Sequence, residues 1–421
     1  MSEARRDQAC CKQTTYFAIS SHFGAQKKNE LVHVHEINHV HETVNNANSM
    51  NRPLSPAQLE QSLAAKLREL LGQVEWLREV QVEIVSGQDP GFDLLAALPL
   101  ADGGKAALCV ECKNELRPNL FAQMAGRNFS PSGKFKAVVR VLALPWVSPR
   151  IAELCAENGW SWFDLAGNYR LDVPGLLRLQ RAGKAPVHKS PRPTANLSTR
   201  EAGRVIRALL LPGNAGMRWT QWEMQKHCQP NVSIGLVNKI ARHLREEAFT
   251  EEMPEGGFRL RDPLKLLFAW REAYRFERHE RRSYFTLLAG KKLRDALASL
   301  GLQTGGFTLY ASFSAAEFQA PHVRQPKTWL YVRQQELSKF EKLVEAKPVD
   351  SGENIVVLIP DDEGVFYLGD GGMMGENRLA CTNAVQTYVD LWHSGGRGHE
   401  AAEALLEQRL KPEWKAGGMK L

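Results

Sequence analysis

The spacing of apolar residues changes several times along the 421-residue chain. Over residues 54–72 leucines fall at every third or fourth position, which predicts an amphipathic helix. Ser55, followed by Pro56 and Gln58, has the pattern of a capping box at the helix start. The expected buried stripe consists of Leu59, Leu63, Leu67 and Leu70. We therefore expect the first ordered domain to begin here.

Alternating or continuously apolar segments follow this helix and predict strands separated by short turns. Three strands, a helix, a strand, a helix and a pair of strands are expected, in that order, at 80–86, 92–100, 106–112, 117–128, 136–144, 148–159 and 160–173. Such an order is typical of a mixed α/β sheet. The Pro-rich, basic segment 178–200 has no period and predicts a linker, so the domain is expected to span residues 53–190.

Residues 1–52 have no amphipathic period and are expected to form a disordered tail. The tail contains the stretch HVHEINHVHE, with histidines at His33, His35, His39 and His41. Paired histidines could bind a transition metal, but the polar composition favours a flexible tail. We assign it no function.

Three short helices and a β-hairpin are expected over residues 197–262, with the hairpin turn at Gly256 and Gly257. In the third helix, residues 233–249, the 3.6-residue period separates two sides. The apolar side holds Ile234, Val237, Ile240, Ala241 and Leu244, and the polar side holds Asn238, Lys239 and Arg242. This order of elements is typical of a winged helix-turn-helix.

Residues 263–421 again alternate between helical and apolar segments. A helix rich in both charges is expected at 264–285, strands at 307–313, 328–332, 354–360 and 365–369, and helices at 383–393 and 398–410. The pattern predicts a second α/β domain, and no repeat relates it to the first.

The amino-acid composition limits the classes of protein to which this chain can belong. Hydrophobic residues make up 43% and charged residues 24%, which is ordinary for a globular protein. No window reaches the roughly 18 apolar residues of a membrane helix, and the N-terminus lacks a signal-peptide pattern, so we expect a cytoplasmic protein. Seven cysteines form neither a disulfide framework nor a CxxC zinc pattern. The net charge of +7 favours a polyanionic partner, with DNA the leading candidate.

A candidate catalytic site lies in the first domain, where Asp93 is near the start of one predicted strand and Glu111 and Lys113 lie at the end of the next. Metal-dependent phosphodiester cleavage needs oxygen ligands beside the phosphate and a group that orients the attacking water. Asp93 and Glu111 would bind Mg²⁺, together with the backbone carbonyl of Cys112. Lys113 would orient the water, and alternation places it on the same strand face as Glu111. Glu60, at the edge of the leucine stripe, is the candidate for a further carboxylate ligand.

The Glu-x-Lys motif alone is weak, since it recurs twice elsewhere in the chain. Only the copy at Glu111 ends an apolar strand, follows an Asp-bearing strand and precedes a helix. In that context residues 55–180 resemble the PD-(D/E)xK restriction-endonuclease-like superfamily, and Gln123 matches a polar position there, although no Pro directly precedes Asp93. The resemblance implies a metal-dependent nuclease. Two alternatives are charges at a solvated strand end and a nuclease-like fold that acts only as a DNA clamp.

The polar side of the third helix suits a DNA major groove. Asn238 is a side chain that pairs with adenine edges, and Arg242 is one that pairs with guanine. Lys239 and Arg245 are better placed to hold phosphates. The alternatives are a solvated basic face and a module that binds protein.

Three further segments carry a second resemblance: VSPRIAELCAENGWSWFDLAGNYRL, YASFSAAEFQAPHV and RLACTNAVQTYVDLWHSGGRGHEAAEALLEQ. They resemble the AbiEi-type transcriptional regulators, the antitoxins of type IV toxin-antitoxin systems, from about residue 140 to the C-terminus. The resemblance implies repression through a winged helix, and a nucleotidyltransferase toxin encoded nearby. It carries no catalytic residue to this chain.

Some relatives of the C-terminal part have a nucleotidyltransferase-like fold, whose chemistry needs Gly-Ser at a helix start and Asp-x-Asp on a strand. YASFSAAEF provides serine without Asp-x-Asp, and the Gly-rich LGDGGMMGENR predicts a surface loop, so residues 263–421 are expected to be non-catalytic. The first hypothesis is a double-stranded-DNA-binding regulator that acts as a homodimer, with the nuclease-like domain as a clamp. The second is a Mg²⁺-dependent DNA endonuclease targeted by the winged helix.

Overall fold

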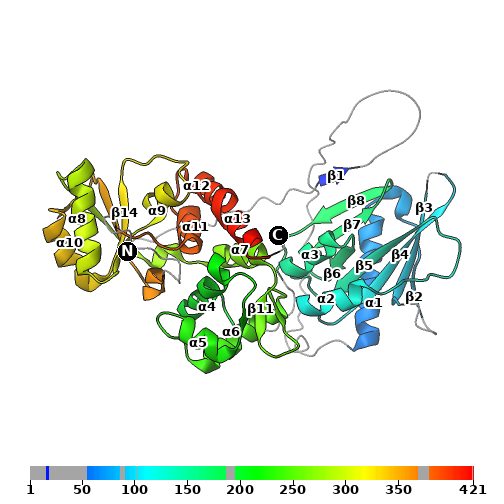
Figure 1. The fold of residues 1–421 in the computed structure, drawn as a ribbon. Coiled ribbons are helices and arrows are strands. Elements are labelled where there is room, and N and C mark those ends of the chain that lie inside the picture. Colours follow the sequence, from blue (N-terminus) through cyan, green and yellow to red (C-terminus); the bar gives the residue numbers. More distant parts are fainter. Residues whose placement is uncertain are drawn as a thin grey trace, which may run out of the picture. The chain divides into compact units, whose positions relative to one another are not determined.

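The computed structural model describes residues 16–18, 55–85, 91–100, 102–185, 195–367, 379–419 and 421. The chain divides into two compact units, Met1–Arg192 and Pro193–Leu421 (Figure 1). The histidine-rich stretch, residues 186–194 of the expected linker and the Gly-rich segment 368–378 lie outside the described residues. Within the described part of the chain, no helix is both long and apolar enough to cross a membrane.

The first unit is built on one mixed sheet with the strand order β1-β8-β7-β6-β5-β4-β3-β2. Its elements are β1 (Tyr16–Ala18), α1 (Pro56–Gly72), β2 (Val82–Ile84), β3 (Leu94–Pro99), β4 (Lys105–Cys112), α2 (Pro118–Ala125), β5 (Ala137–Leu144), α3 (Pro149–Glu157), β6 (Ser161–Asp164), β7 (Tyr169–Val173) and β8 (Leu177–Arg181). Strands β4, β5 and β6 are parallel, and the other neighbours are antiparallel. The prediction of an α/β domain is confirmed for this unit.

Helices cover both faces of this sheet (Figure 1). The leucine stripe of α1 packs with Val141 and Ala143 on one face, whereas Leu142 and Leu144 pack with α2 and α3 on the other. Alternation along β5 therefore supplies both cores. The expected capping box at the start of α1 is present: the Ser55 side chain accepts from the backbone N–H of Gln58, and the Gln58 side chain accepts from the backbone N–H of Ser55.

Two short strands correct the expected boundaries of the first domain. β1 lies within the segment expected to be disordered and pairs with β8. Its Tyr-Phe-Ala sequence has the aromatic content that favours strands. β8 lies where the linker was expected to begin. There, buried Leu177 and Leu179 alternate with exposed Arg178 and Gln180, which is the period of a strand. The prediction missed this strand because the segment is rich in basic residues.

The second unit begins with α4 (Arg200–Leu210), β9 (Arg218–Trp219), α5 (Gln221–His227), α6 (Ile234–Glu246), β10 (Thr250–Glu252) and β11 (Phe258–Leu260). Three helices thus precede a hairpin, and β9 completes a three-stranded sheet. One hydrophobic core joins these elements to residues beyond 262. For example, the Trp414 indole donates to the carbonyl of Leu210 at 2.8 Å, so the expected boundary at 262/263 does not separate two cores.

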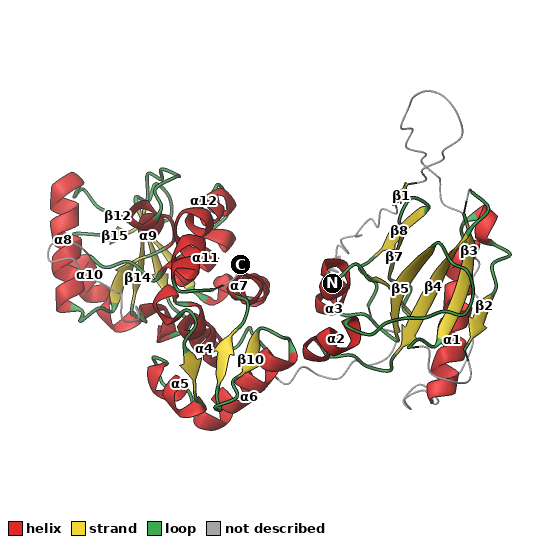
Figure 2. Cartoon of the chain, turned by 45° about the vertical axis from the view of Figure 1, so that its right-hand side comes forward, coloured by secondary structure: helices red, strands yellow, loops and turns green. Residues whose placement is uncertain are grey.

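The rest of this unit surrounds a sheet of order β13-β14-β16-β12-β15. Its elements are α7 (Pro263–Ala273), β12 (Glu280–Phe285), α8 (Gly290–Gln303), β13 (Thr308–Tyr310), α9 (Ser312–Gln319), β14 (Thr328–Val332), α10 (Leu337–Leu343), β15 (Lys347–Pro348), β16 (Ile355–Ile359), α11 (Ala384–His393), α12 (Gly398–Leu405) and α13 (Lys411–Ala416). Figure 2 shows α8 and α10 on one face and α9 and α11 on the other. Alternate residues of β14 and β16 enter the two cores accordingly.

Three expectations for residues 263–421 are wrong in detail. The charged helix ends at Ala273, and residues 280–285 form β12, whose antiparallel pairing with β16 is a non-local interaction. The segment expected as a strand at 365–369 begins in a 3-10 turn, Glu363–Phe366, that buries Val365 without a strand partner. The strand expected at 307–313 ends at Tyr310, because Ser312 starts α9 with a φ of 45°.

Candidate nucleic-acid interface and nuclease-like cluster

Helix α6 has one buried and one exposed side. Its buried residues are Val237, Ile240, Ala241, His243 and Leu244, four of which the 3.6-residue period predicted. His243 was not predicted, and burial lowers its pKa, which favours the neutral imidazole. Ile234, expected in the core, is 49% exposed because it lies in the first turn.

The predicted DNA-contacting residues of α6 lie in two environments. Asn238, Lys239 and Arg242 are exposed. Asn238 Oδ1 accepts a hydrogen bond from Gln221 Nε2 of α5 at 3.2 Å, which orients its amide. Arg245 is half-buried and forms an ion pair with Glu252 of β10, so this guanidinium must exchange its partner before it can hold a phosphate.

The hairpin after α6 has a turn that requires glycine. Gly256 and Gly257 have φ angles of 84° and 83°, as in turns that side chains disfavour. A Cβ at Gly257 would lie 2.5 Å from the Trp219 carbonyl oxygen, so this position excludes larger residues. Arg218 donates to the Gly256 carbonyl at 2.9 Å and fixes the hairpin tip against β9.

In the first unit, Asp93 lies immediately before β3 and is bound to the end of β4. Its Oδ2 accepts a hydrogen bond from the backbone N–H of Cys112 at 2.6 Å. Its own backbone N–H donates to the carbonyl of Val110 at 2.8 Å. These two bonds place the Asp93 carboxylate next to the last residues of β4.

Glu111 is 2% exposed, and its carboxylate faces two cations. Oε1 lies 2.6 Å from Lys113 Nζ and 3.0 Å from an Arg127 guanidinium nitrogen. The pairing with Lys113 agrees with the strand alternation. Arg127, two residues after α2 ends, was missed because its contact with Glu111 depends on how α2 packs on the sheet.

The Cys112 thiol is affected by the charges of the four predicted site residues. Burial raises the pKa of its thiol, the carboxylates of Asp93, Glu60 and Glu111 raise it further, and Lys113 lowers it. Hydrogen bonds and ion pairs bring Asp93, Glu111 and Lys113 together at the end of β4, whereas Glu60 of α1 acts on the thiol through its charge.

A metal ion needs carboxylate oxygens that are directed at a common point. Among the described residues, however, no group of three or more His, Cys, Asp or Glu side chains could hold a metal ion. The Glu111 carboxylate binds two cations and the Asp93 carboxylate binds a backbone amide. In this arrangement the residues do not fit Mg²⁺, and the predicted metal site stays a prediction.

The second unit thus combines three helices and a hairpin with an α/β domain. Residues 259–411 match a family described as "Transcriptional regulator, AbiEi antitoxin, Type IV TA system". The match includes two of the three segments that carry the sequence resemblance, and the segment around residues 147–171 lies outside it. No curated protein and no solved structure matches the chain.

Proposed function

We propose that this chain is a DNA-binding transcriptional regulator of the antitoxin type, in which residues 197–262 act as a winged helix-turn-helix. One observation carries the proposal: the exposed, basic face of α6 is followed by a glycine-turned hairpin, whose second strand leads into the region that matches the regulator family. In a winged helix the last helix enters the major groove and the hairpin contacts the backbone.

Over residues 238–242 the composition of the α6 surface favours DNA over a protein partner, whereas Ile234 and Leu236 in its first turn are exposed apolar side chains. A protein-binding helix face is typically depleted in lysine and enriched in aromatic residues. The exposed positions 238, 239 and 242 are Asn, Lys and Arg, which are side chains that bind base edges and phosphates.

We propose a supporting role for the first unit as a DNA clamp. Glu111 is buried, but Lys113 and Arg127 keep 39% and 51% of their side chains exposed. A buried carboxylate that aligns two accessible cations leaves their outer donors available for one phosphate. The same pairing opposes catalysis, because it occupies the carboxylate that a metal would need.

Lys239→Ala is expected to weaken binding to operator and unrelated DNA alike. Loss of one phosphate contact should reduce the slope of log K against log salt by about 0.9. Fluorescence anisotropy between 50 and 200 mM salt measures this, with the exposed Lys292, on α8, changed to alanine as the control. An unchanged slope in Lys239→Ala would exclude a phosphate contact at this position.

The nuclease alternative is tested in the presence of Mg²⁺ or Mn²⁺. We expect no plasmid nicking, because Glu111 already binds Lys113 and Arg127. Cleavage by the parent chain that falls by orders of magnitude in both Glu111→Ala and Lys113→Ala would instead establish a working nuclease. Cleavage that survives both changes would come from a contaminant.

Regulators of this shape usually read repeated half-sites, so we propose that two copies occupy one operator. Light scattering coupled to size exclusion should give a complex with two chains per duplex at saturation. One chain per duplex would contradict this. A nucleotidyltransferase-type toxin encoded nearby is the proposed protein partner, and co-purification with that gene product tests it.

A further inference from the structure

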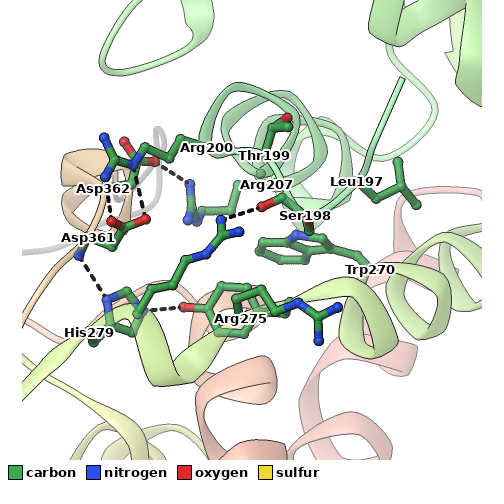
Figure 3. Close-up of a pocket in the computed structure, with 13 residues that line it drawn as sticks. Leu197, Ser198, Thr199, Arg200, Arg207, Trp270, Arg275, His279, Asp361 and Asp362 are labelled. Carbon is green, nitrogen blue, oxygen red and sulfur yellow. Dashed lines mark hydrogen bonds and ion pairs between the residues drawn. The ribbon is translucent and has the colours of Figure 1, made fainter. Parts of the chain in front are cut away.

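A pocket in the second unit lies where the start of α4 meets α7, the 3-10 turn Phe276–Arg278 and the loop after β16 (Figure 3). Its wall contains four arginines from two separate segments: Arg200, Arg207, Arg275 and Arg278. Two carboxylates, Asp361 and Asp362, also line it. Burial and the charge of Arg207 lower the pKa of His279 to about 4, so this histidine is neutral. The four arginines outnumber the two aspartates, so the net charge of the lining is positive.

The floor of the pocket holds a buried cation. Arg207 is 3% exposed and lies over the Trp270 ring, with 5.4 Å between the guanidinium carbon and the ring centre. Its Nε donates to Gln386 Oε1 at 2.6 Å. One terminal nitrogen of the same guanidinium is buried without a hydrogen-bond partner, and the nearest carboxylate oxygen, Asp362 Oδ2, is 3.8 Å away.

An unsatisfied buried donor on a charged group destabilises the folded protein. Asp362 Oδ2 is also buried without a hydrogen-bond partner, but at 3.8 Å it pairs with Arg207 only as an ion pair, and Asp362 Oδ1 accepts from Arg204 at 2.6 Å. Arg207 thus places a largely desolvated guanidinium in the pocket lining, with only part of its charge compensated by Asp362. An acceptor with negative charge satisfies this donor better than a neutral one does.

The start of α4 adds an independent attraction for anions. Thr199 caps this eleven-residue helix and lines the pocket, and the positive end of a helix dipole favours a negative group. At the mouth, Arg275 and Arg278 are exposed. Arg278 donates to the Ser198 carbonyl at 2.9 Å, which holds its guanidinium over the helix start.

We propose that this pocket binds the phosphate group of a small phosphorylated molecule. The phosphate would accept from Arg207 in the floor and from Arg275 and Arg278 at the mouth, which are donors suited to its several oxygens. Trp270 supplies an aromatic face beside the site. Helix α4 also belongs to the proposed winged helix. An occupied pocket would therefore act as an effector site for DNA binding, and this step rests on the proposed function.

The binding step is tested on the full chain without DNA. Isothermal titration with inorganic phosphate and with pyrophosphate, at ionic strength matched with sodium chloride, should give saturable binding. Arg278→Gln and Arg275→Gln should each weaken it by tenfold or more. Arg324→Gln, which changes an exposed arginine outside the pocket, should leave it unchanged.

Several results would overturn the proposal: no saturable binding to either anion, or equal binding by the parent and Arg278→Gln. A non-operator duplex that competes with phosphate on the parent but not on the Arg275→Gln and Arg278→Gln double variant would assign the pocket to the DNA backbone instead. Arg207→Gln tests whether the buried arginine contributes to phosphate binding. If this change unfolds the protein, Arg275→Gln and Arg278→Gln, which change exposed residues, still test the proposal. Failure here leaves the operator-binding tests of α6 untouched.

Discussion

Arg242→Ala is expected to lose about 1–3 kcal/mol of binding free energy on the operator, a fall in affinity of roughly 5- to 150-fold. Arg242 lies on the exposed side of α6, one turn after Asn238. Arginine binds guanine through two parallel hydrogen bonds, so its removal should affect the specific site more than unrelated DNA. Anisotropy titrations against both duplexes measure the difference.

Arg324→Ala serves as the matched control, since it removes one exposed arginine and the same charge elsewhere in the unit. An equal loss on both duplexes would make Arg242 a phosphate contact. Unchanged affinity on both would remove α6 from the interface.

Asp390→Asn is expected to stabilise the second unit increasingly as the pH rises. Asp390 is fully buried, and desolvation raises the pKa of its carboxyl to about 7. Tyr274, Tyr331 and Gln386 all donate to its Oδ1, and an asparagine oxygen can accept the same three hydrogen bonds. The variant therefore removes the charge and keeps these three bonds, and its amide nitrogen replaces Oδ2, which has no hydrogen-bond partner, at a cost that does not vary with pH.

The direction of this pH dependence follows from how many protons the folded and the unfolded states bind. Between its unfolded pKa near 4 and about 7, Asp390 holds more proton in the folded state, so its contribution to stability is lost as the pH rises. His279 has a pKa of about 4 in the folded state, so its own contribution makes the protein more stable as the pH rises over part of that range. The informative quantity is thus the unfolding free energy of Asp390→Asn minus that of the parent.

This difference should grow by a few kcal/mol between pH 4 and 7, at about 1.4 kcal/mol per pH unit, and then level off. Urea unfolding at several pH values measures it. Asp361→Asn is the control, because pairing with Arg200 lowers the pKa of Asp361 and confines its effect to acid pH. A difference independent of pH would contradict the placement of Asp390.

The sequence could predict the features that depend on neighbouring residues. The leucine stripe and capping box of α1 and the two sides of α6 follow from helical spacing and local hydrogen bonds. The meeting of Glu111 and Lys113 follows from alternation along β4 and the residue after it. Ile234 is the exception, because burial in the first turn depends on what covers the helix end.

Features that depend on distant segments were not predicted. The charged residues 280–282 suggested a helix surface, but pairing with β16 makes them part of a strand. Arg127 reaches Glu111 only through the packing of α2 on the sheet. Likewise, the pocket proposed to bind phosphate joins Arg207 of α4 to residues about 60 to 155 positions further along, and no spacing in the sequence reports that.

Footprinting of the full chain on the DNA upstream of its own gene tests the central proposal most directly. We expect a defined protected site at physiological salt, occupied at concentrations where unrelated DNA of equal length is still free. The triple change of Asn238, Lys239 and Arg242 to alanine should abolish the protection while the variant remains folded by circular dichroism. Uniform protection along all DNA, or a site that survives the triple change, would contradict the account.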